Sequence, residues 1–108
     1  MTAVQAVEVS EAIVLEALRE VIDPDLGVNV VDLGFVYELD LAGAPAVLTM
    51  TLTSPACPLT GVIEDQIRTA LGPILTAYEV RWVWRPAWTP ARITEDGREQ
   101  LQAIGFTL

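Results

Sequence analysis

The single cysteine of the chain, Cys57, stands directly before Pro58 and ahead of an apolar pattern with helical spacing. Proline is favoured at the first position of a helix, which predicts Cys57 as the N-cap residue. The thiol would then lie beside unpaired backbone N–H groups and the positive end of the helix dipole, which favour the thiolate. Because the thiolate is the nucleophilic and metal-binding form, Cys57 is a candidate reactive or ligating residue. A buried, inert cysteine is the competing interpretation, since free cysteine is often buried.

Two carboxylates, Asp23 and Asp25, flank Pro24 where the first predicted helix ends. The proline makes the turn rigid, so the pair could bind a hard cation or orient hydrogen-bond donors of a partner. Solvated turn residues give the same pattern, and the spacing alone does not bring this turn to Cys57. Both interpretations stay open for this acidic pair.

Three threonines, Thr49, Thr51 and Thr53, are predicted to share one face of a strand that leads to Cys57. Their hydroxyl groups could donate hydrogen bonds to a complex held by the thiolate. Ordinary β-propensity gives the same pattern without any ligand.

The composition of the chain excludes several kinds of chemistry. All six basic residues are arginines, there is no histidine, and fifteen acidic residues give a formal net charge of −9. Without histidine, serine triads, cysteine–histidine pairs and histidine-based zinc sites are excluded. The acidic surface would repel phosphate backbones and anionic lipids, so we expect no nucleic acid and no membrane as partners. One cysteine, no apolar stretch of membrane-spanning length and no basic secretory start predict a cytoplasmic protein.

Three helices are predicted to surround the candidate residues. The first begins after the N-cap Ser10 and ends near Asp23, because a proline follows and disfavours helical geometry in the residue before it. The second starts at Pro58 and ends at Gly72. A short final helix follows its N-cap, Thr94.

Alternating patterns predict strands over 35–41, 47–53 and 78–85. The first two form an antiparallel hairpin, and the third is parallel to the second. The side chains expected on one face of the first strand are those of Phe35, Tyr37, Leu39 and Leu41. The element order is αββαβα, which predicts a single α/β (α+β) domain over 9–108, with helices packed on a small mixed three-stranded sheet. Residues 1–8 are expected to form a flexible tail.

Four motifs occur in a characteristic order: Asp-Pro-Asp at 23–25, Val-Asn-Val-Val-Asp-Leu-Gly at 28–34, Thr-Leu-Thr-Ser-Pro-Ala-Cys-Pro at 51–58, and Pro-Ala-Trp-Thr-Pro at 86–90. Together they resemble the SufT and PaaD-like family of metal–sulfur (iron–sulfur) cluster assembly factors, relatives of the eukaryotic cytosolic iron–sulfur targeting subunit. These proteins carry the iron–sulfur cluster assembly (FSCA) domain.

The resemblance implies an α/β domain and a non-enzymatic role in the maturation of apo iron–sulfur or metal enzymes. It implies Cys57 as the thiolate ligand or transfer residue, with Asp23, Asp25, Thr51 and Thr53 in supporting positions. Family members usually have glutamate where this chain has the shorter Asp25. PaaD members also continue into a cysteine-bearing extension, which we do not expect here because Cys57 is the only cysteine.

The expected cofactor is an iron–sulfur cluster bound transiently. A cluster usually takes four ligands, so Cys57 suffices only with ligands from a second chain, as in a homodimer, or from a partner. The expected partners are a P-loop ATPase scaffold or an apo iron–sulfur client protein. In an alternative adaptor role without metal, Trp88 docks on the ATPase scaffold or on an oxygenase component. A third hypothesis, a cysteine enzyme, would have only Asp23 or Asp25 as its base.

Overall fold

The computed structural model describes residues 10–43, 45–53 and 59–106 of the chain. The elements, in chain order, are α1 (Glu11–Leu18), β1 (Val36–Asp40), β2 (Ala46–Met50), α2 (Thr60–Leu71), β3 (Tyr78–Trp82), the 3-10 helix η1 (Pro90–Arg92) and α3 (Glu95–Ala103). The predicted αββαβα order is confirmed, with η1 as an addition. The predicted tail, 1–8, lies outside the described residues.

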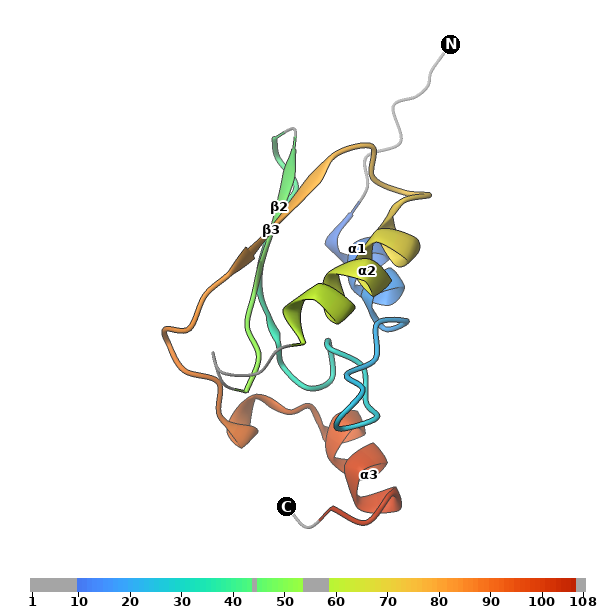
Figure 1. Ribbon diagram of the computed structural model, residues 1–108, viewed down its shortest axis with the longest axis vertical. Helices are drawn as coiled ribbons and strands as arrows, with labels where there is room; N and C mark the ends of the chain where they lie inside the picture. The colour runs from blue at the N-terminus through green and yellow to red at the C-terminus, as the bar shows by residue number, and fades with distance from the viewer. Residues whose placement is uncertain (1–9, 44, 54–58, 107–108) are drawn as a thin grey trace.

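The sheet is mixed and has the order β1-β2-β3. β1 pairs antiparallel with β2, and β2 pairs parallel with β3, as the sequence predicted. Helices α1 and α2 lie on one side of this sheet, and α3 lies beyond one end of it (Figure 1). Leu48 and Met50 of β2 are fully buried, whereas Thr49 between them is only partly buried, so β2 turns alternate side chains towards the helices.

The core between the sheet and the helices is apolar. Its fully buried side chains include Val14 and Leu18 of α1, Leu48 and Met50 of β2, and Ile63, Ile67 and Leu71 of α2. Their spacings of four residues in the helices and two in the strand match the two structural periods, which explains why the element types could be predicted.

Helix α1 is shorter than predicted. Its start is confirmed, because the Oγ of Ser10 accepts the N–H of Ile13 at 3.3 Å. The helix ends at Leu18 rather than near Asp23. The N–H groups of Glu20 and Val21 donate to C=O groups three residues earlier, as in a 3-10 turn. Ile22 then forms a β-bridge with Asn29.

A β-bulge changes the predicted faces of β1. Val36 lies opposite Met50 and Glu38 lies opposite Thr49, so β1 has one extra residue, Tyr37. Val36 therefore packs against the core, while Tyr37 and Glu38 line a pocket beside Thr49. The prediction that Tyr37 shares a face with Leu39 is wrong, because the bulge interrupts the alternation.

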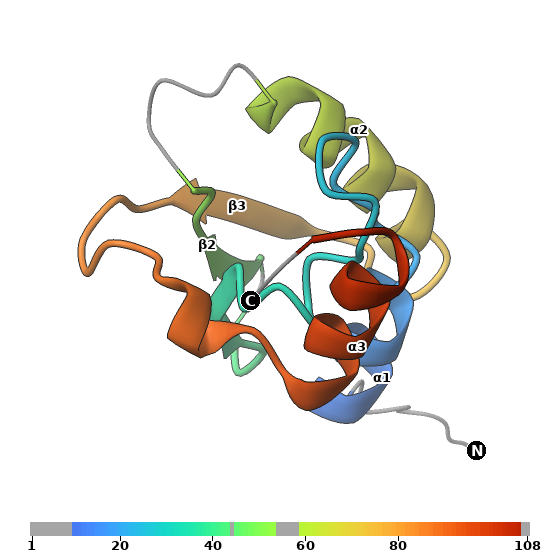
Figure 2. The same ribbon diagram turned by 90° about the horizontal axis from the view of Figure 1, so that it is seen from below.

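The segment after β3 folds back on the turn that precedes β1. The N–H of Thr94 donates to the C=O of Asp32 at 2.9 Å. Thr94 also caps α3 as predicted, since its Oγ1 accepts the N–H of Gly97 at 3.0 Å. Figures 1 and 2 show α3 lying next to the loop that follows α1.

Candidate functional site

The cysteine-containing segment joins the carboxyl end of β2 to the start of α2. Cys57 lies outside the described residues, so its environment stays a prediction. The parallel neighbour β3 ends at the same edge of the sheet, where the N–H of Val83 donates to the C=O of Met50 at 2.8 Å. Ligand sites in open α/β sheets usually lie at the carboxyl ends of parallel strands.

Helix α2 begins two residues later than the sequence predicted. Its first residue is Thr60 and its N-cap is Leu59, so the prediction of Cys57 as N-cap and Pro58 as first helical residue is wrong. Among the described residues, the C=O of Leu59 is the first to accept a helical hydrogen bond, from the N–H of Ile63 at 2.9 Å. Proline at the first helical position is a preference, and it does not fix where the hydrogen-bond ladder starts.

The first turn of α2 has no side-chain cap and no acidic residue. Leu59 has no acceptor on its side chain, so no first-turn N–H group of the helix donates a hydrogen bond to the side chain of the N-cap residue. Fifteen acidic residues occur in the chain, yet none stands in this turn. The end of α2 that follows Cys57 is therefore electrostatically suited to a negative group.

Asp23 shapes the turn that was predicted as a candidate acidic site. Its side chain is only 3% exposed, and its Oδ1 accepts the backbone N–H groups of Asp25 at 2.8 Å and Leu26 at 3.0 Å. The C=O of Asp23 also accepts the N–H of Gly27 at 2.7 Å. Asp25, by contrast, is exposed. The two carboxylates therefore have different surroundings: one is used inside the turn and the other faces solvent.

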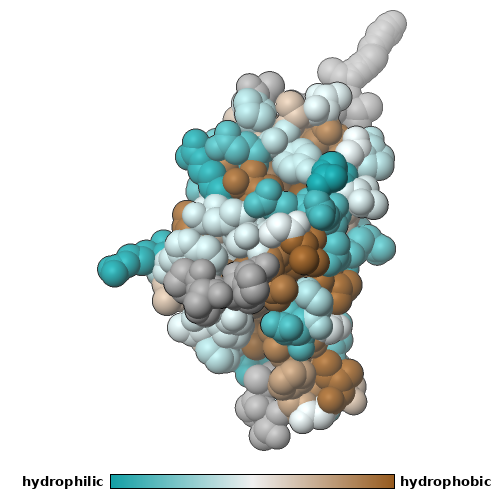
Figure 3. All heavy atoms as spheres, in the orientation of Figure 1, coloured by the Kyte–Doolittle hydropathy of each residue, from teal (hydrophilic) through white to brown (hydrophobic). Residues whose placement is uncertain are grey.

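The turn that contains Asp23 is attached to the side of α2. The side-chain amide of Gln66 accepts the N–H of Ile22 at 2.8 Å and donates to its C=O at 2.9 Å. Gln66 stands six residues after Thr60, about 9 Å along a helix axis. Figure 2 shows the loop after α1 beside α2. Figure 3 shows apolar patches among polar ones on this side of the molecule. Ile22 in the loop and Val62 in α2 are both exposed. The fold thus brings the Asp23 turn to the helix that follows Cys57.

The threonines do not share one face. Thr49 is partly buried, Thr51 is 1% exposed and Thr53 is exposed. β2 ends at Met50, so Thr51 and Thr53 follow the strand instead of continuing its alternation. The hydroxyl of Thr51 donates to the neighbouring C=O of Leu52 at 3.3 Å. The predicted set of hydroxyl donors on one strand face is therefore wrong, because the strand is shorter than its sequence pattern.

Trp88, the predicted partner-binding residue, is half-buried within the chain. Its indole N–H donates to the C=O of Leu33 at 2.6 Å. Its ring meets that of Phe35 edge-to-face, with 5.6 Å between ring centroids. Its role in partner binding stays a prediction, but the polar group of the indole is already used to hold the segment after β3.

A buried polar cluster around Asp32 was not predicted from the sequence. The carboxylate is 5% exposed and accepts hydrogen bonds from the side chains of Asn29 at 2.8 Å, Thr94 at 2.9 Å and Gln100 at 3.1 Å. Burial by itself raises the pKa of a carboxyl group, but these hydrogen bonds and the charge of Arg19 outweigh it and lower the pKa of Asp32. Thr94 and Gln100 are 62 and 68 residues away from Asp32 in the sequence, so only the folded chain reveals the cluster.

Within the described parts of the chain, no group of three or more histidine, cysteine, aspartate or glutamate side chains is arranged to hold a metal ion. No described helix is long and apolar enough to cross a membrane.

Comparisons with known proteins give a consistent result. A family model described as iron–sulfur cluster assembly protein matches residues 11–82. The Fe–S protein maturation auxiliary factor YitW of Bacillus subtilis is 44% identical over 79 residues, which cover 70% of this chain and 78% of that protein. The Fe–S protein maturation auxiliary factor SufT of Staphylococcus aureus is 43% identical over 72 residues, which cover 64% of this chain and 82% of that protein.

The fold is also similar to a solved structure. The crystal structure of a domain of unknown function, DUF59, from Bacillus anthracis superposes with a TM-score of 0.77 and 36% sequence identity. The superposition covers 90% of this chain and 92% of that one, so the similarity includes the segment after β3 as well as the sheet and the first two helices.

Proposed function

Because this chain belongs to the iron–sulfur cluster assembly protein family, we propose that it delivers iron–sulfur clusters to apo-proteins, with the thiolate of Cys57 as a transient cluster ligand. Its general function is iron–sulfur protein maturation. The observation that carries the finer proposal is the place of Cys57 between the carboxyl end of β2 and the start of α2. We expect this delivery to take place in the cytoplasm and without enzymatic turnover.

The number of ligands that a cluster needs means that more than one protein must bind it. A cluster usually takes four ligands, and this chain has one cysteine and no histidine. A homodimer would supply two thiolates, and the apo-protein or a P-loop ATPase scaffold would supply the remaining ligands. A cluster held in this way exchanges easily, because each chain contributes a single thiolate bond.

The helix that follows Cys57 in the sequence, and the turn bound to it, support such a role. The first turn of α2 has no acidic residue, so it does not repel a thiolate or an anionic cluster. The bonds between Gln66 and Ile22 hold the Asp23 turn against the same helix, so the exposed Asp25 stands on a fixed loop. Asp25 and Thr53 are exposed and are the supporting residues best placed to contact a partner.

Anaerobic reconstitution with ferrous iron and sulfide tests the proposal. Cys57→Ser removes the thiolate, whereas Asp96→Asn removes an exposed carboxylate of α3 and serves as the control for iron held by acidic groups. We expect the wild type and Asp96→Asn to retain iron and sulfide and to transfer them to an apo iron–sulfur enzyme, and Cys57→Ser to retain neither. Equal retention by all three proteins would reject Cys57 as a ligand.

The adaptor function makes the opposite prediction. If the chain only joins partner proteins through Trp88, Trp88→Ala abolishes copurification of the ATPase scaffold or oxygenase component and Cys57→Ser leaves client maturation unchanged. Trp88→Phe keeps the packing on Phe35 and separates loss of a docking residue from loss of the fold. Unimpaired maturation with Cys57→Ser would favour the adaptor over the carrier.

A further inference from the structure

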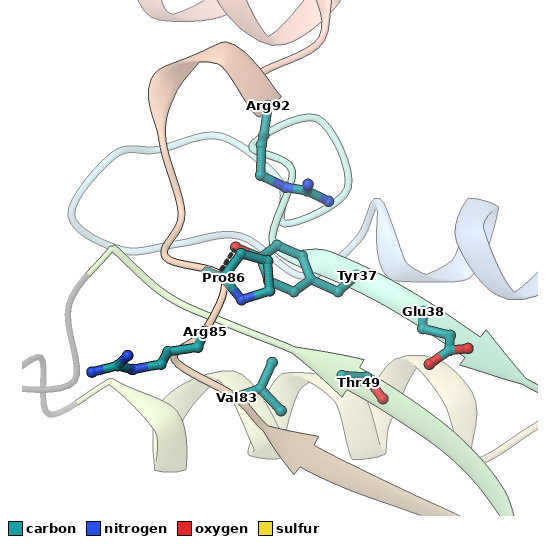
Figure 4. A pocket seen from close by; sticks show the side chains of 7 residues that line it. All are labelled: Tyr37, Glu38, Thr49, Val83, Arg85, Pro86 and Arg92. Carbon is teal, nitrogen blue, oxygen red and sulfur yellow. Dashed lines mark hydrogen bonds between the residues drawn. The ribbon is translucent and has the colours of Figure 1, made fainter.

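A pocket of about 430 Å³ lies on the face of the sheet opposite α1 and α2. Tyr37 and Glu38 come from the bulge in β1, Thr49 comes from β2, and Arg85 and Arg92 come from the segment after β3 (Figure 4). None of these residues belongs to the segment that contains Cys57. The pocket therefore has its own set of lining residues.

The bulge is what gives the pocket its shape. An extra residue in β1 places two consecutive side chains, Tyr37 and Glu38, beside Thr49, where a regular strand would present only one. The hydroxyl of Tyr37 donates to the C=O of Pro86 at 2.8 Å, which fixes its ring across the two segments. β-Bulges often re-aim side chains next to binding sites.

Arg92 is held over this pocket as a fixed cation. Its guanidinium carbon lies 4.0 Å from the centroid of the Tyr37 ring, and its Nε donates to the C=O of Gly34 at 3.2 Å. These two contacts use one face and one N–H of the guanidinium. In the described residues, its Nη groups have no hydrogen-bond acceptor, so this pair of donors remains available to bind a carboxylate end-on.

The distribution of ion pairs is uneven across the molecule. Arg19, Arg68 and Arg81 each pair with a carboxylate of their own chain. Arg85, Arg92 and Arg98 have no such partner among the described residues, although the chain has fifteen acidic residues, and two of these three line the pocket. The pocket therefore combines unpaired positive charge with a surface that is otherwise strongly acidic.

We propose that this pocket binds a carboxylate side chain from an acidic peptide segment of a partner protein. The fork of Arg92 would hold the carboxylate, Thr49 would donate a hydrogen bond, and Arg85, which extends outward in Figure 4, would attract a second acidic residue at the rim. The pocket is open along the sheet surface, which suits a side chain presented by a protein rather than an enclosed metabolite.

Glu38 determines how a bound peptide is oriented in the pocket. It lies across the pocket from Arg92 and has no ion-pair partner among the described residues (Figure 4). It would accept an N–H group of the bound peptide and would repel a carboxylate at that end. The acidic side chain of the peptide is therefore directed towards Arg92.

A titration followed by nitrogen-15 NMR tests this proposal. The probe is a blocked tetrapeptide with two adjacent glutamates between glycines, and its glutamine counterpart is the matched control, both in about 150 mM salt to screen the net charge. We expect the glutamate peptide to shift the signals of Tyr37, Thr49 and Arg92, and the glutamine peptide to shift none of them. Shifts confined to other residues, or equal shifts with both peptides, would overturn the proposal.

Two variants and one control locate the interaction. Arg85→Gln is expected to weaken binding about threefold, as for an exposed ion pair, and Arg92→Lys about tenfold, because lysine keeps the charge but lacks the fork. Arg68→Gln on α2 removes the same charge as Arg85→Gln and is expected to leave the affinity unchanged. If Arg68→Gln and Arg85→Gln weakened peptide binding equally, the loss of affinity would come from the change in net charge, and the proposed binding site would be wrong.

Other occupants of the pocket have distinct signatures. Shifts of the same residues that depend on protein concentration without any peptide would identify a second copy of this chain and overturn the partner peptide. Free acetate binding as tightly as the glutamate peptide would identify a small carboxylate and overturn it as well. If Arg92→Lys fails to fold, Arg85→Gln still decides the question, because its side chain is exposed and has no ion-pair partner among the described residues.

Discussion

Two aspartates of this chain are almost equally buried but have different functions in the fold. Asp23 is 3% exposed, and within the described part of the chain its carboxylate accepts hydrogen bonds only from backbone N–H groups two and three residues further along. Asp32 is 5% exposed and accepts hydrogen bonds from three side chains, those of Asn29, Thr94 and Gln100. Asp23 therefore shapes a local turn, whereas Asp32 joins the turn before β1 to α3. Burial alone does not distinguish these functions; the origin of the hydrogen-bond donors does.

The largest expected effect is that of Asp32→Ala. The substitution leaves three side-chain donors without their acceptor, of which that of Asn29 is buried, and removes the connection to α3, so we expect the free energy of unfolding to fall by about 3 kcal/mol. Asp23→Ala should cost about 1 kcal/mol, because its donors are backbone groups of one turn that water can reach when the turn relaxes. Chemical denaturation measures both losses.

Hydrogen exchange sharpens this contrast. Asp32→Ala should speed amide exchange in α3, and Asp23→Ala should speed it only in the turn after α1. Equal stability losses with unchanged exchange in α3 would mean that Asp32 does not hold this helix.

Two glycines test how closely α3 approaches Asp32. A Cβ at Gly97 would lie 2.7 Å from the C=O oxygen of Asp32, whereas a Cβ at Gly61 in α2 would meet nothing within 4 Å. Both glycines are helical, so propensity favours alanine equally at the two sites. We expect Gly97→Ala to lower the free energy of unfolding by about 1–3 kcal/mol and Gly61→Ala to raise it by about 0.5–1 kcal/mol. Stabilisation by both substitutions would show that α3 can move away from Asp32 at little cost.

A smaller effect is expected where Trp88 attaches the segment after β3. Trp88→Phe keeps an aromatic ring against Phe35 but removes the N–H that donates to the C=O of Leu33. Because one hydrogen bond is lost, we expect the free energy of unfolding to fall by about 1 kcal/mol, measured by thermal or chemical denaturation. A loss much above that of Asp32→Ala would make the indole, rather than the aspartate, the main attachment of this segment.

The features that the sequence predicted correctly are local ones. Ser10 and Thr94 cap their helices because a cap needs only a polar side chain two or three residues before the N–H groups that it accepts. Leu48 and Met50 point into the core because strand alternation is a property of the residues themselves. The turn at Asp23 follows for the same reason, since its donors are neighbours in sequence.

The features that could not be predicted depend on contacts between distant segments. The bulge at Tyr37 arises from the register between β1 and β2, which the alternation within β1 does not specify. Asp32 receives a hydrogen bond from Gln100, 68 residues away. Arg85 and Arg92 reach one pocket only because the chain after β3 folds back. Two arginines in one short segment of an acidic chain were the only sequence feature that pointed to this pocket. The sequence did not show which residues Arg85 and Arg92 would contact.

The smallest expected effect concerns pH and again distinguishes Asp32 from an ordinary surface acid. Folding lowers its pKa, so the carboxylate contributes stability above the unfolded value of about 3.9 and loses this contribution as pH falls through the lower folded value. Gln100→Ala removes one of the hydrogen bonds that lower the pKa and should move this acid-induced loss to higher pH. Asp32→Asn should flatten the dependence between about pH 5 and 2 relative to wild type, because it has no proton to bind there. Denaturation midpoints of the wild type and both variants, measured across this pH range, test the prediction. If neither substitution changed the slope of stability against pH, the acid sensitivity would come from other carboxylates.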